Sequence, residues 1–334
     1  MKDFGYARAA DVDAALGALA QPQTSVIAGG TELLNWMRLG IAEPERVLDI
    51  GGIEALRGIE RDGDQLVIGA RATLKEVAEH PLIEQLAGAL ASACRQAAST
   101  QLRNRATLGG NVLQRTRCPY FRAESPVPWP CNKREPGSGC ASLAGRHERQ
   151  AVFGWTQGCV AVHPSDPAVA LAALDAQVDL AGAAGARSIA MREFLLTQAE
   201  AAERGEPLRE NQLGADELIV GYRLPVRTNE TSAYVKVRER ASYEYAIVSA
   251  AASVELSDTR IVAARIALGS VAQRPWRLPS AETALAGQLL TRDAVMPIIG
   301  AALADADPLP NNGFKVVMAR NAAVRALLLA GGVL

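Results

Sequence analysis

The sequence has few of the residues that would indicate a disulfide scaffold, a metal-dependent hydrolase or a nucleic-acid binder. Its 334 residues include five cysteines and three histidines, aromatic residues make up 4%, and the formal net charge is -1. Five cysteines are too few for a fold of this length to be held together by disulfides. The balanced charge gives no basic surface of the kind that binds nucleic acid. No apolar run reaches the roughly 18 residues of a membrane span, and the first residues carry no export signal. We expect a soluble globular protein, cytoplasmic by default, with no membrane span and no nucleic-acid partner.

The pattern of apolar residues indicates two domains. At about 150 residues per domain, a chain of this length suggests two, and the polar stretch Pro225–Thr231 is a candidate linker. We expect a first domain over residues 1–225. It is divided into a small parallel α/β subdomain, 1–55, and a second subdomain, 56–225, that carries an insert at 115–160. The C-terminal domain, 230–334, is expected to form three antiparallel strands followed by helices.

Individual elements follow from periodicity and capping signals. Thr73 followed by Glu76 forms a capping box, and an Ala-rich run predicts one helix from about Ile83 to Ser99. Other helices are predicted at Asp11–Leu19, Glu32–Arg38, Pro167–Leu174, Ser280–Ala286, Arg292–Asp305 and Phe314–Leu329. Strands are predicted at Ser25–Ile27, Arg46–Ile50, Gln65–Gly69, Val178–Ala181, Glu217–Leu224, Ala233–Arg238, Ala246–Leu256 and Arg260–Gly269.

Two glycine-rich turns are candidates for binding a phosphate. The first, Ala28-Gly29-Gly30-Thr31, stands between a predicted strand and a predicted helix. Without Cβ atoms its backbone N–H groups can converge on a pyrophosphate, and a helix N-terminus adds positive potential. The second, Thr107-Leu108-Gly109-Gly110-Asn111, follows the long helix. Each alone also suits an ordinary turn, but together with His163-Pro164-Ser165-Asp166 before an apolar helix they form a more specific set.

This ordered set of motifs resembles a known family. AGGTELL, ATLGGN, HPSD and Tyr234-Val235-Lys236-Val237-Arg238 follow one another as in the FAD-binding subunit of molybdenum hydroxylases, the xanthine dehydrogenase and aldehyde oxidoreductase family. The resemblance runs from about Phe4 to Leu329. It implies an oxidoreductase subunit with an α+β fold: a two-part FAD-binding domain like that of vanillyl-alcohol oxidase, then a smaller α/β C-terminal domain with a three-stranded antiparallel sheet and helices.

The same resemblance assigns FAD contacts to particular residues. The pyrophosphate and the flavin edge are assigned to Ile27, Ala28, Gly29, Gly30, Thr31, Glu32 and Leu33, the last two nearest the ring. The second phosphate and the ribityl chain are assigned to Thr107, Gly109, Gly110 and Asn111. Asp166 is a polar contact, Ile219 an apolar wall, and Lys236 a cation that would stabilise an anionic reduced flavin. Where many relatives place an aromatic residue beside the flavin, this chain has Gln96-Ala97-Ala98-Ser99.

Four of the five cysteines fall within an irregular insert at 115–160, where prolines and glycines break regular structure. Cys118, Cys131, Cys140 and Cys159 are spaced C-x12-C-x8-C-x18-C, without the close pairs of most structural zinc sites. Four thiolates on a stiffened loop suit a [4Fe–4S] cluster, and seven Lys/Arg against three Glu in residues 115–150 would offset its negative charge. Zinc, two disulfides and unligated thiols are the alternatives. Some relatives, including certain aldehyde oxidoreductases, resemble this chain in carrying such a loop. Cys94, in an apolar helical run, is expected in the core.

The chain lacks the other cofactor sites of a whole molybdenum hydroxylase. It has no molybdopterin site, and two [2Fe–2S] centres would need about eight further cysteines. The resemblance therefore implies a heterotrimer with a molybdopterin-binding large subunit and a [2Fe–2S] small subunit, in which this chain passes electrons from FAD to an external acceptor. A stand-alone FAD oxidase and a zinc-stabilised interaction module are the alternatives. A signal-bearing partner would make the location periplasmic.

Overall fold

The N-terminal strands form a small parallel sheet in the computed structural model, which describes residues 1–334. In spatial order they are β1 (Gly5–Arg8), β3 (Arg46–Asp49) and β2 (Thr24–Ile27). Helices α1 (Val12–Leu19) and α2 (Leu33–Arg38) make the two crossovers. Because β2 is an edge strand, the first glycine turn leaves the sheet at its border, next to the rest of the molecule.

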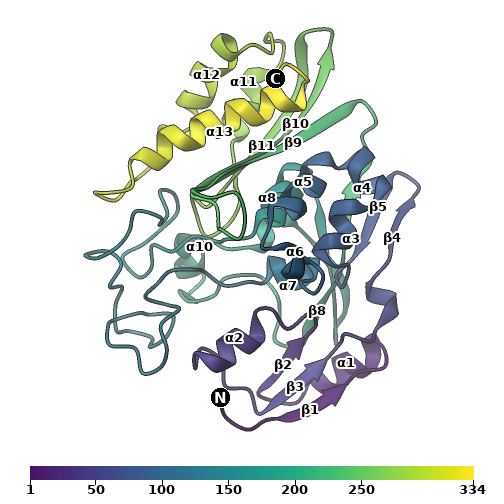
Figure 1. Cartoon of the computed structure of the whole chain (residues 1–334), viewed down its shortest axis with the longest axis vertical. Helices are drawn as coiled ribbons and strands as arrows, with labels where there is room; N and C mark the ends of the chain where they lie inside the picture. The colour runs from purple at the N-terminus through teal and green to yellow at the C-terminus, as the bar shows by residue number, and fades with distance from the viewer.

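A five-stranded antiparallel sheet forms the middle of the molecule (Figure 1). Its strands, in spatial order, are β4 (Ile59–Asp62), β5 (Gln65–Gly69), β8 (Glu217–Pro225), β6 (Gln177–Gly182) and β7 (Gly185–Ala190). The accompanying helices are η1 (Glu54–Leu56), α3 (Leu74–Glu79), α4 (Pro81–Leu86), α5 (Gly88–Gln96), α6 (Thr100–Arg103), α7 (Leu108–Val112), α8 (Asp166–Ala173), α9 (Met191–Phe194) and α10 (Gln198–Glu203). The largest hydrophobic core lies between this sheet and helices α3, α5 and α8.

The single helix predicted from Ile83 to Ser99 is wrong, because α4 and α5 are separate helices. Ala87, with φ -145° and ψ 49°, breaks the run between them. The break lets the first turn of α5 dock on a strand of the C-terminal domain, where the N–H of Ala89 donates to Ser232 Oγ (3.0 Å). A propensity-based prediction misses this tertiary contact.

The C-terminal domain is an antiparallel sheet packed between two sets of helices. Its strands, in spatial order, are β12 (Trp276–Arg277), β11 (Arg260–Gly269), β10 (Val248–Ser257) and β9 (Glu230–Val237), followed in the chain by α11 (Pro279–Leu285), α12 (Arg292–Ala301) and α13 (Phe314–Ala330). The sequence pattern does not indicate the two-residue strand β12. Along β10, Ala250 and Ala252 join the core that includes α13, whereas Ala251 joins the core of the middle sheet. The two domains therefore share one tightly packed interface.

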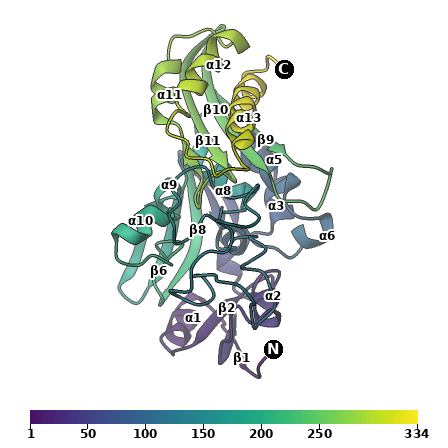
Figure 2. The same cartoon turned by 90° about the vertical axis from the view of Figure 1, so that its left-hand side faces the viewer.

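The irregular insert lies between α7 and α8, and no helix or strand occurs in residues 113–165. It forms the loops beside α2 and below α13 in Figure 1, midway between the two ends of the molecule in Figure 2. Lys315 of α13 is fully buried and ties the insert to the C-terminal domain. Its Nζ donates to the carbonyls of Arg149 (3.0 Å) and Gln150 (2.6 Å) in the insert and to that of Ser270 (2.6 Å) in the C-terminal domain. None of the helices is long and apolar enough to span a membrane.

Candidate functional site

The two glycine-rich turns lie against each other. A Cβ on Gly29 would stand 1.8 Å from the carbonyl oxygen of Arg105, so only glycine lets the first turn pack against the residues leading into the second. Gly30 has φ +76°, a conformation that L side chains rarely adopt. The close approach to the Arg105 backbone therefore explains Gly29, and the positive φ explains Gly30. The two turns meet at one place.

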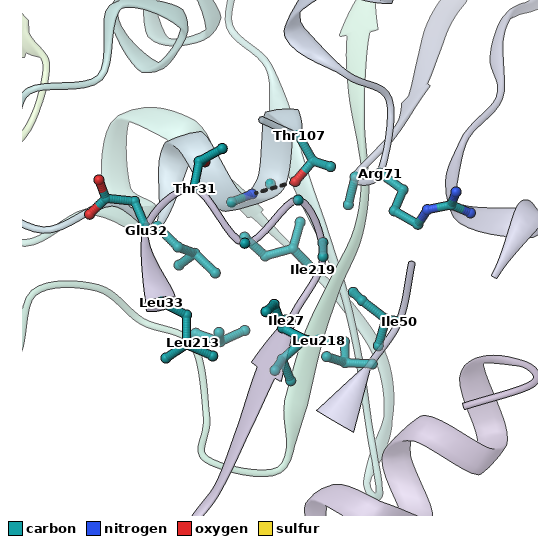
Figure 3. A pocket seen from close by; sticks show the side chains of 18 of the residues that line it. Ile27, Thr31, Glu32, Leu33, Ile50, Arg71, Thr107, Leu213, Leu218 and Ile219 are labelled. Atoms are coloured by element: carbon teal, nitrogen blue, oxygen red, sulfur yellow. Dashed lines mark hydrogen bonds between the residues drawn. The ribbon is translucent and has the colours of Figure 1, made fainter. Parts of the chain in front are cut away.

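The first turn offers a row of unused backbone donors. The N–H groups of four consecutive residues donate no hydrogen bond within the chain, namely Gly29, Gly30, Thr31 and Glu32. The second turn differs, because the Gly109 N–H donates to the Ala70 carbonyl (2.9 Å) and the Gly110 N–H to Thr107 Oγ1 (3.2 Å; Figure 3). The first turn is thus the one whose amides can bind a phosphate. The second turn, whose Gly109 and Gly110 amides are already bonded, forms part of the wall of the same site.

A cavity of about 180 Å³ opens where the two turns meet. Its apolar wall comes from β2, α2, β8 and neighbouring loops and includes Ile27, Leu33, Ile50, Leu213, Leu218 and Ile219. Figure 3 shows these side chains in the lower part of the pocket, with those of Thr31, Thr107 and Arg71 above them. An apolar wall facing a row of free amides suits a nucleotide, whose base and phosphates need these two environments.

A second cavity, of about 350 Å³, adjoins the first through the shared residues Thr31, Glu32 and Gly110. Asn111 and Asp166, both predicted as cofactor contacts, line this second cavity. Together the two cavities can hold a ligand longer than either one. The residues expected to touch one elongated cofactor are therefore brought together by the fold.

Small side chains form the wall where relatives were expected to place an aromatic ring. Ala97 and Ala98 line the second cavity, and Ala98 has φ +50°. Two tyrosines from the loop between β9 and β10, Tyr243 and Tyr245, line the same cavity. The sequence reasoning missed them, because an isolated aromatic in a loop carries no local signal of what it faces. They supply the aromatic surface that the Gln96–Ser99 stretch lacks.

Asp166 and Lys236 form a buried ion pair behind the second cavity. Lys236 Nζ donates to Asp166 Oδ2 (2.7 Å) and to the Gln96 carbonyl (3.1 Å), and its side chain is 1% exposed. Tyr234 donates its hydroxyl to Asp166 Oδ1 (2.5 Å). Burial raises the pKa of Asp166, and Lys236 and Tyr234 oppose that rise. Lys236 is therefore not an exposed strand lysine but a cation fixed at the site.

Glu32 connects the two cavities to the cysteine insert. Its carboxylate pairs with Arg117 and with Arg122 (2.9 Å) of the insert, and it accepts a hydrogen bond from Trp36 Nε1 (2.8 Å). Arg117 also lies over the ring of Tyr245, 4.5 Å from its centroid. The sequence placed Glu32 at the flavin edge but gave no sign of these arginine partners.

The four insert cysteines line one cavity. Cys118, Cys131, Cys140 and Cys159 all border it, and Cys131 and Cys140 pair as an isolated antiparallel bridge. None forms a disulfide. No three His, Cys, Asp or Glu side chains lie close enough to hold a single metal ion. Cys94 is fully buried in the main core, as predicted, and burial raises the pKa of its thiol.

A charged cluster borders the cysteine cavity. Lys133, whose side chain is 2% exposed, donates to Glu210 Oε1 (2.6 Å), and Arg115 donates to Glu210 Oε2 (2.7 Å). Burial alone would raise the pKa of Glu210, but Lys133 and Arg115 lower it to about 2. The carboxylate is thus ionised at any physiological pH. Sequence spacing could not reveal this group, since Glu210 lies far along the chain from the insert.

Two of the three histidines, His163 and His147, line neither of the two cavities. His163 Nε2 is hydrogen-bonded to the Val112 carbonyl (3.0 Å), and burial lowers its pKa to about 4. The neutral ring therefore serves as a donor that ties α7 to the segment before α8. His147, also buried, accepts a hydrogen bond from the Asn311 N–H (3.2 Å).

Family models match both domains of the chain. Residues 2–227 match the FAD binding domain in molybdopterin dehydrogenase, and residues 233–330 match the CO dehydrogenase flavoprotein C-terminal domain. The chain belongs to the family of FAD-binding medium subunits of molybdenum hydroxylases. It is an oxidoreductase subunit with the α+β fold of that family.

Individual members of this family align along nearly the whole chain. The aldehyde oxidoreductase FAD-binding subunit PaoB of Escherichia coli (strain K12) is 39% identical over 96% of each chain. The carbon monoxide dehydrogenase medium chain of Hydrogenophaga pseudoflava is 26% identical over 97% of this chain and 96% of that one. A solved structure of carbon monoxide dehydrogenase from the same organism, lacking the Mo-pyranopterin moiety, superposes with a TM-score of 0.76 at 25% identity, covering 99% and 98% of the chains.

The family binds FAD, and the residues predicted to contact FAD lie around the two adjoining cavities. The predicted contacts that line the first cavity are Ile27, Ala28, Gly29, Gly30, Thr31, Glu32, Leu33, Thr107, Gly109, Gly110 and Ile219. Asn111 and Asp166 line the second, and Lys236 lies behind Asp166. The free amides of the first turn and the apolar wall beside them suit the phosphates and one of the aromatic rings of this cofactor.

Proposed function

We propose that this chain is the FAD- and [4Fe–4S]-binding subunit of a heterotrimeric molybdenum-containing oxidoreductase of the aldehyde oxidoreductase and xanthine dehydrogenase type. Its partners are a molybdopterin-binding large subunit and a [2Fe–2S] small subunit. The chain takes electrons from the small subunit and passes them to an external acceptor. The observation that carries the flavin role is the row of four free amides at the mouth of two adjoining cavities. The 39% identity to an aldehyde oxidoreductase subunit supports an aldehyde as the substrate of the complex.

The residues of this chain bind and orient the flavin cofactor. FAD, when bound, supplies the ability to take up single electrons and release pairs. The first turn holds the phosphates through its N–H groups, and the apolar wall shields one of the aromatic rings of the cofactor from water. Asn111 and Asp166 face the second cavity, and the buried Lys236 behind Asp166 offsets the charge of that carboxylate.

The arrangement of the four cysteines supports the cluster. Each thiolate of a cubane binds a different iron, so its four sulfurs stand farther apart than around a single zinc ion. All four cysteines line one cavity. Lys133 adds a buried cation beside them. This combination favours a [4Fe–4S] cluster over zinc.

Cofactor analysis of the anaerobically purified chain tests both halves of the proposal. We expect about one FAD and about four irons per chain, with an electron paramagnetic resonance signal of a [4Fe–4S] cluster after dithionite reduction. Cys131→Ser should lose most of the iron, whereas Cys94→Ala, which alters a core thiol away from the insert, should keep it. Zinc in place of iron would overturn the cluster assignment, and a folded chain without flavin would overturn the FAD role.

A further inference from the structure

Gln273 directs a side-chain amide at one of the four cysteines. Its Nε2 lies 3.4 Å from the Sγ of Cys159, and the two residues are 8% and 7% exposed. The Oε1 of the same amide has no hydrogen-bond partner. A thiolate can only accept, so the NH₂ end of the amide is the end that must face the sulfur. The amide thus gives its donor to Cys159 and leaves its own oxygen unpaired.

The backbone that carries Gln273 is fixed by the insert itself. The Val152 N–H donates to the Val271 carbonyl (2.8 Å), and the His163 N–H donates to the Ala272 carbonyl (2.9 Å). The two donors stand on either side of Cys159 in the sequence. The two acceptors, Val271 and Ala272, are the residues directly before Gln273. The C-terminal domain therefore holds the amide in a set position against the cysteine cavity.

A positive charge lies beside the same cavity. Lys133 lines it with a side chain that is 2% exposed, and Glu210 is shared between Lys133 and Arg115. Two cations against one carboxylate leave one unit of positive charge next to the cysteines. Because this charge is partly shielded from water, its influence on the sulfurs is stronger than that of a surface lysine.

We infer that Gln273 tunes the reduction potential of the [4Fe–4S] cluster by donating a hydrogen bond to the sulfur of Cys159, with Lys133 as the electrostatic background. The inference rests on the cluster proposed above. Reduction of the cluster by one electron, taken from the [2Fe–2S] small subunit, adds negative charge that spreads onto the thiolate sulfurs. A hydrogen-bond donor and a nearby cation stabilise that charge, so both raise the potential. Gln273 binds no iron and acts only through Cys159.

A redox titration of the purified complex, followed by electron paramagnetic resonance, tests the role of Gln273. Gln273→Met keeps the length of the side chain and removes the donor, so the cluster midpoint should move to a more negative potential. Gln273→Glu replaces the donor by a carboxylate and should move it further the same way. Gln101→Met, an exposed position on α6, is the matched control and should leave the midpoint unchanged. The flavin midpoint, read in the same titration, should not move in any variant.

Iron analysis of each sample separates failure of this inference from failure of the cluster itself. A full complement of iron with an unchanged cluster midpoint in both Gln273 variants would overturn the tuning role and leave the cluster proposal intact. A wild-type complex without a [4Fe–4S] signal would overturn both. If Gln273→Met loads little iron, the Gln273→Glu midpoint decides, since Glu has nearly the same shape as Gln.

Discussion

Glu32 and Asp166, two of the carboxylates that line the flavin cavities, are each paired with cations from other parts of the chain. Arg117 and Arg122 of the insert pair with Glu32, and Lys236 of β9 pairs with Asp166. FAD carries a negative pyrophosphate, and unpaired carboxylates in its cavity would repel it. The cations therefore offset the negative charge that these two carboxylates would present to an anionic cofactor.

Lys236→Met should destabilise the protein, and the loss should grow as the pH rises. The change leaves Asp166 buried with the Tyr234 hydroxyl as a hydrogen-bond donor but without the cation that balances its charge, which costs about 3–5 kcal/mol. Burial already raises the pKa of Asp166, so at low pH the variant carboxyl takes up a proton and becomes neutral. Its pKa in the folded state then lies above that in the unfolded state, and the stability kept at low pH is lost as the pH climbs through the folded-state value.

Urea unfolding between pH 5 and pH 8 measures this effect. The double variant Asp166→Asn/Lys236→Met carries no buried charge and should recover most of the stability that Lys236→Met loses. If the double variant were as unstable as Lys236→Met at every pH, the buried ion pair would not be the cause.

At the scale of elements, the features that the sequence predicts well are local ones. The capping box at α3 is present, with the Glu76 N–H donating to Thr73 Oγ1 (3.2 Å) and the Thr73 N–H donating to Glu76 (2.8 Å). The strand, turn and helix around the first glycine turn also follow from local pattern. The contacts that complete the sites do not follow from local pattern. Gln273, for example, donates to Cys159 although the two residues are 114 positions apart in the sequence. Periodicity reports which face of an element is buried, and it does not report what covers that face.

Gly29→Ala should separate the two glycine turns and lower the FAD content. The added Cβ would meet the Arg105 backbone, which cannot move aside as a flexible side chain could. Gly17→Ala is the matched control, because Gly17 lies inside α1 with nothing near its missing Cβ. That control should keep its flavin and gain about 0.5–1 kcal/mol of stability. Flavin absorbance per chain and urea unfolding report both outcomes, and full flavin content in a folded Gly29→Ala protein would contradict the packing argument.

At the scale of the whole molecule, the insert links the proposed cluster to the flavin cavities. Cys118 follows Asn111 by seven residues and Cys159 precedes Asp166 by seven, so each stretch spans at most about 25 Å. Arg117, the neighbour of Cys118, pairs with Glu32, which lines both flavin cavities. The two cofactor sites therefore share one continuous part of the structure, as an electron-transfer subunit requires.

Removal of FAD from the assembled complex tests the relay most directly. When an aldehyde is added anaerobically to the FAD-depleted complex, the [2Fe–2S] centres should still become reduced, as followed by stopped-flow absorbance. Reduction of an artificial acceptor should be lost, and it should return when FAD is added back. The isolated chain, with no molybdenum site, should oxidise no aldehyde. Acceptor reduction at the full rate without FAD, or aldehyde oxidation by the isolated chain at the rate of the complex, would contradict the account.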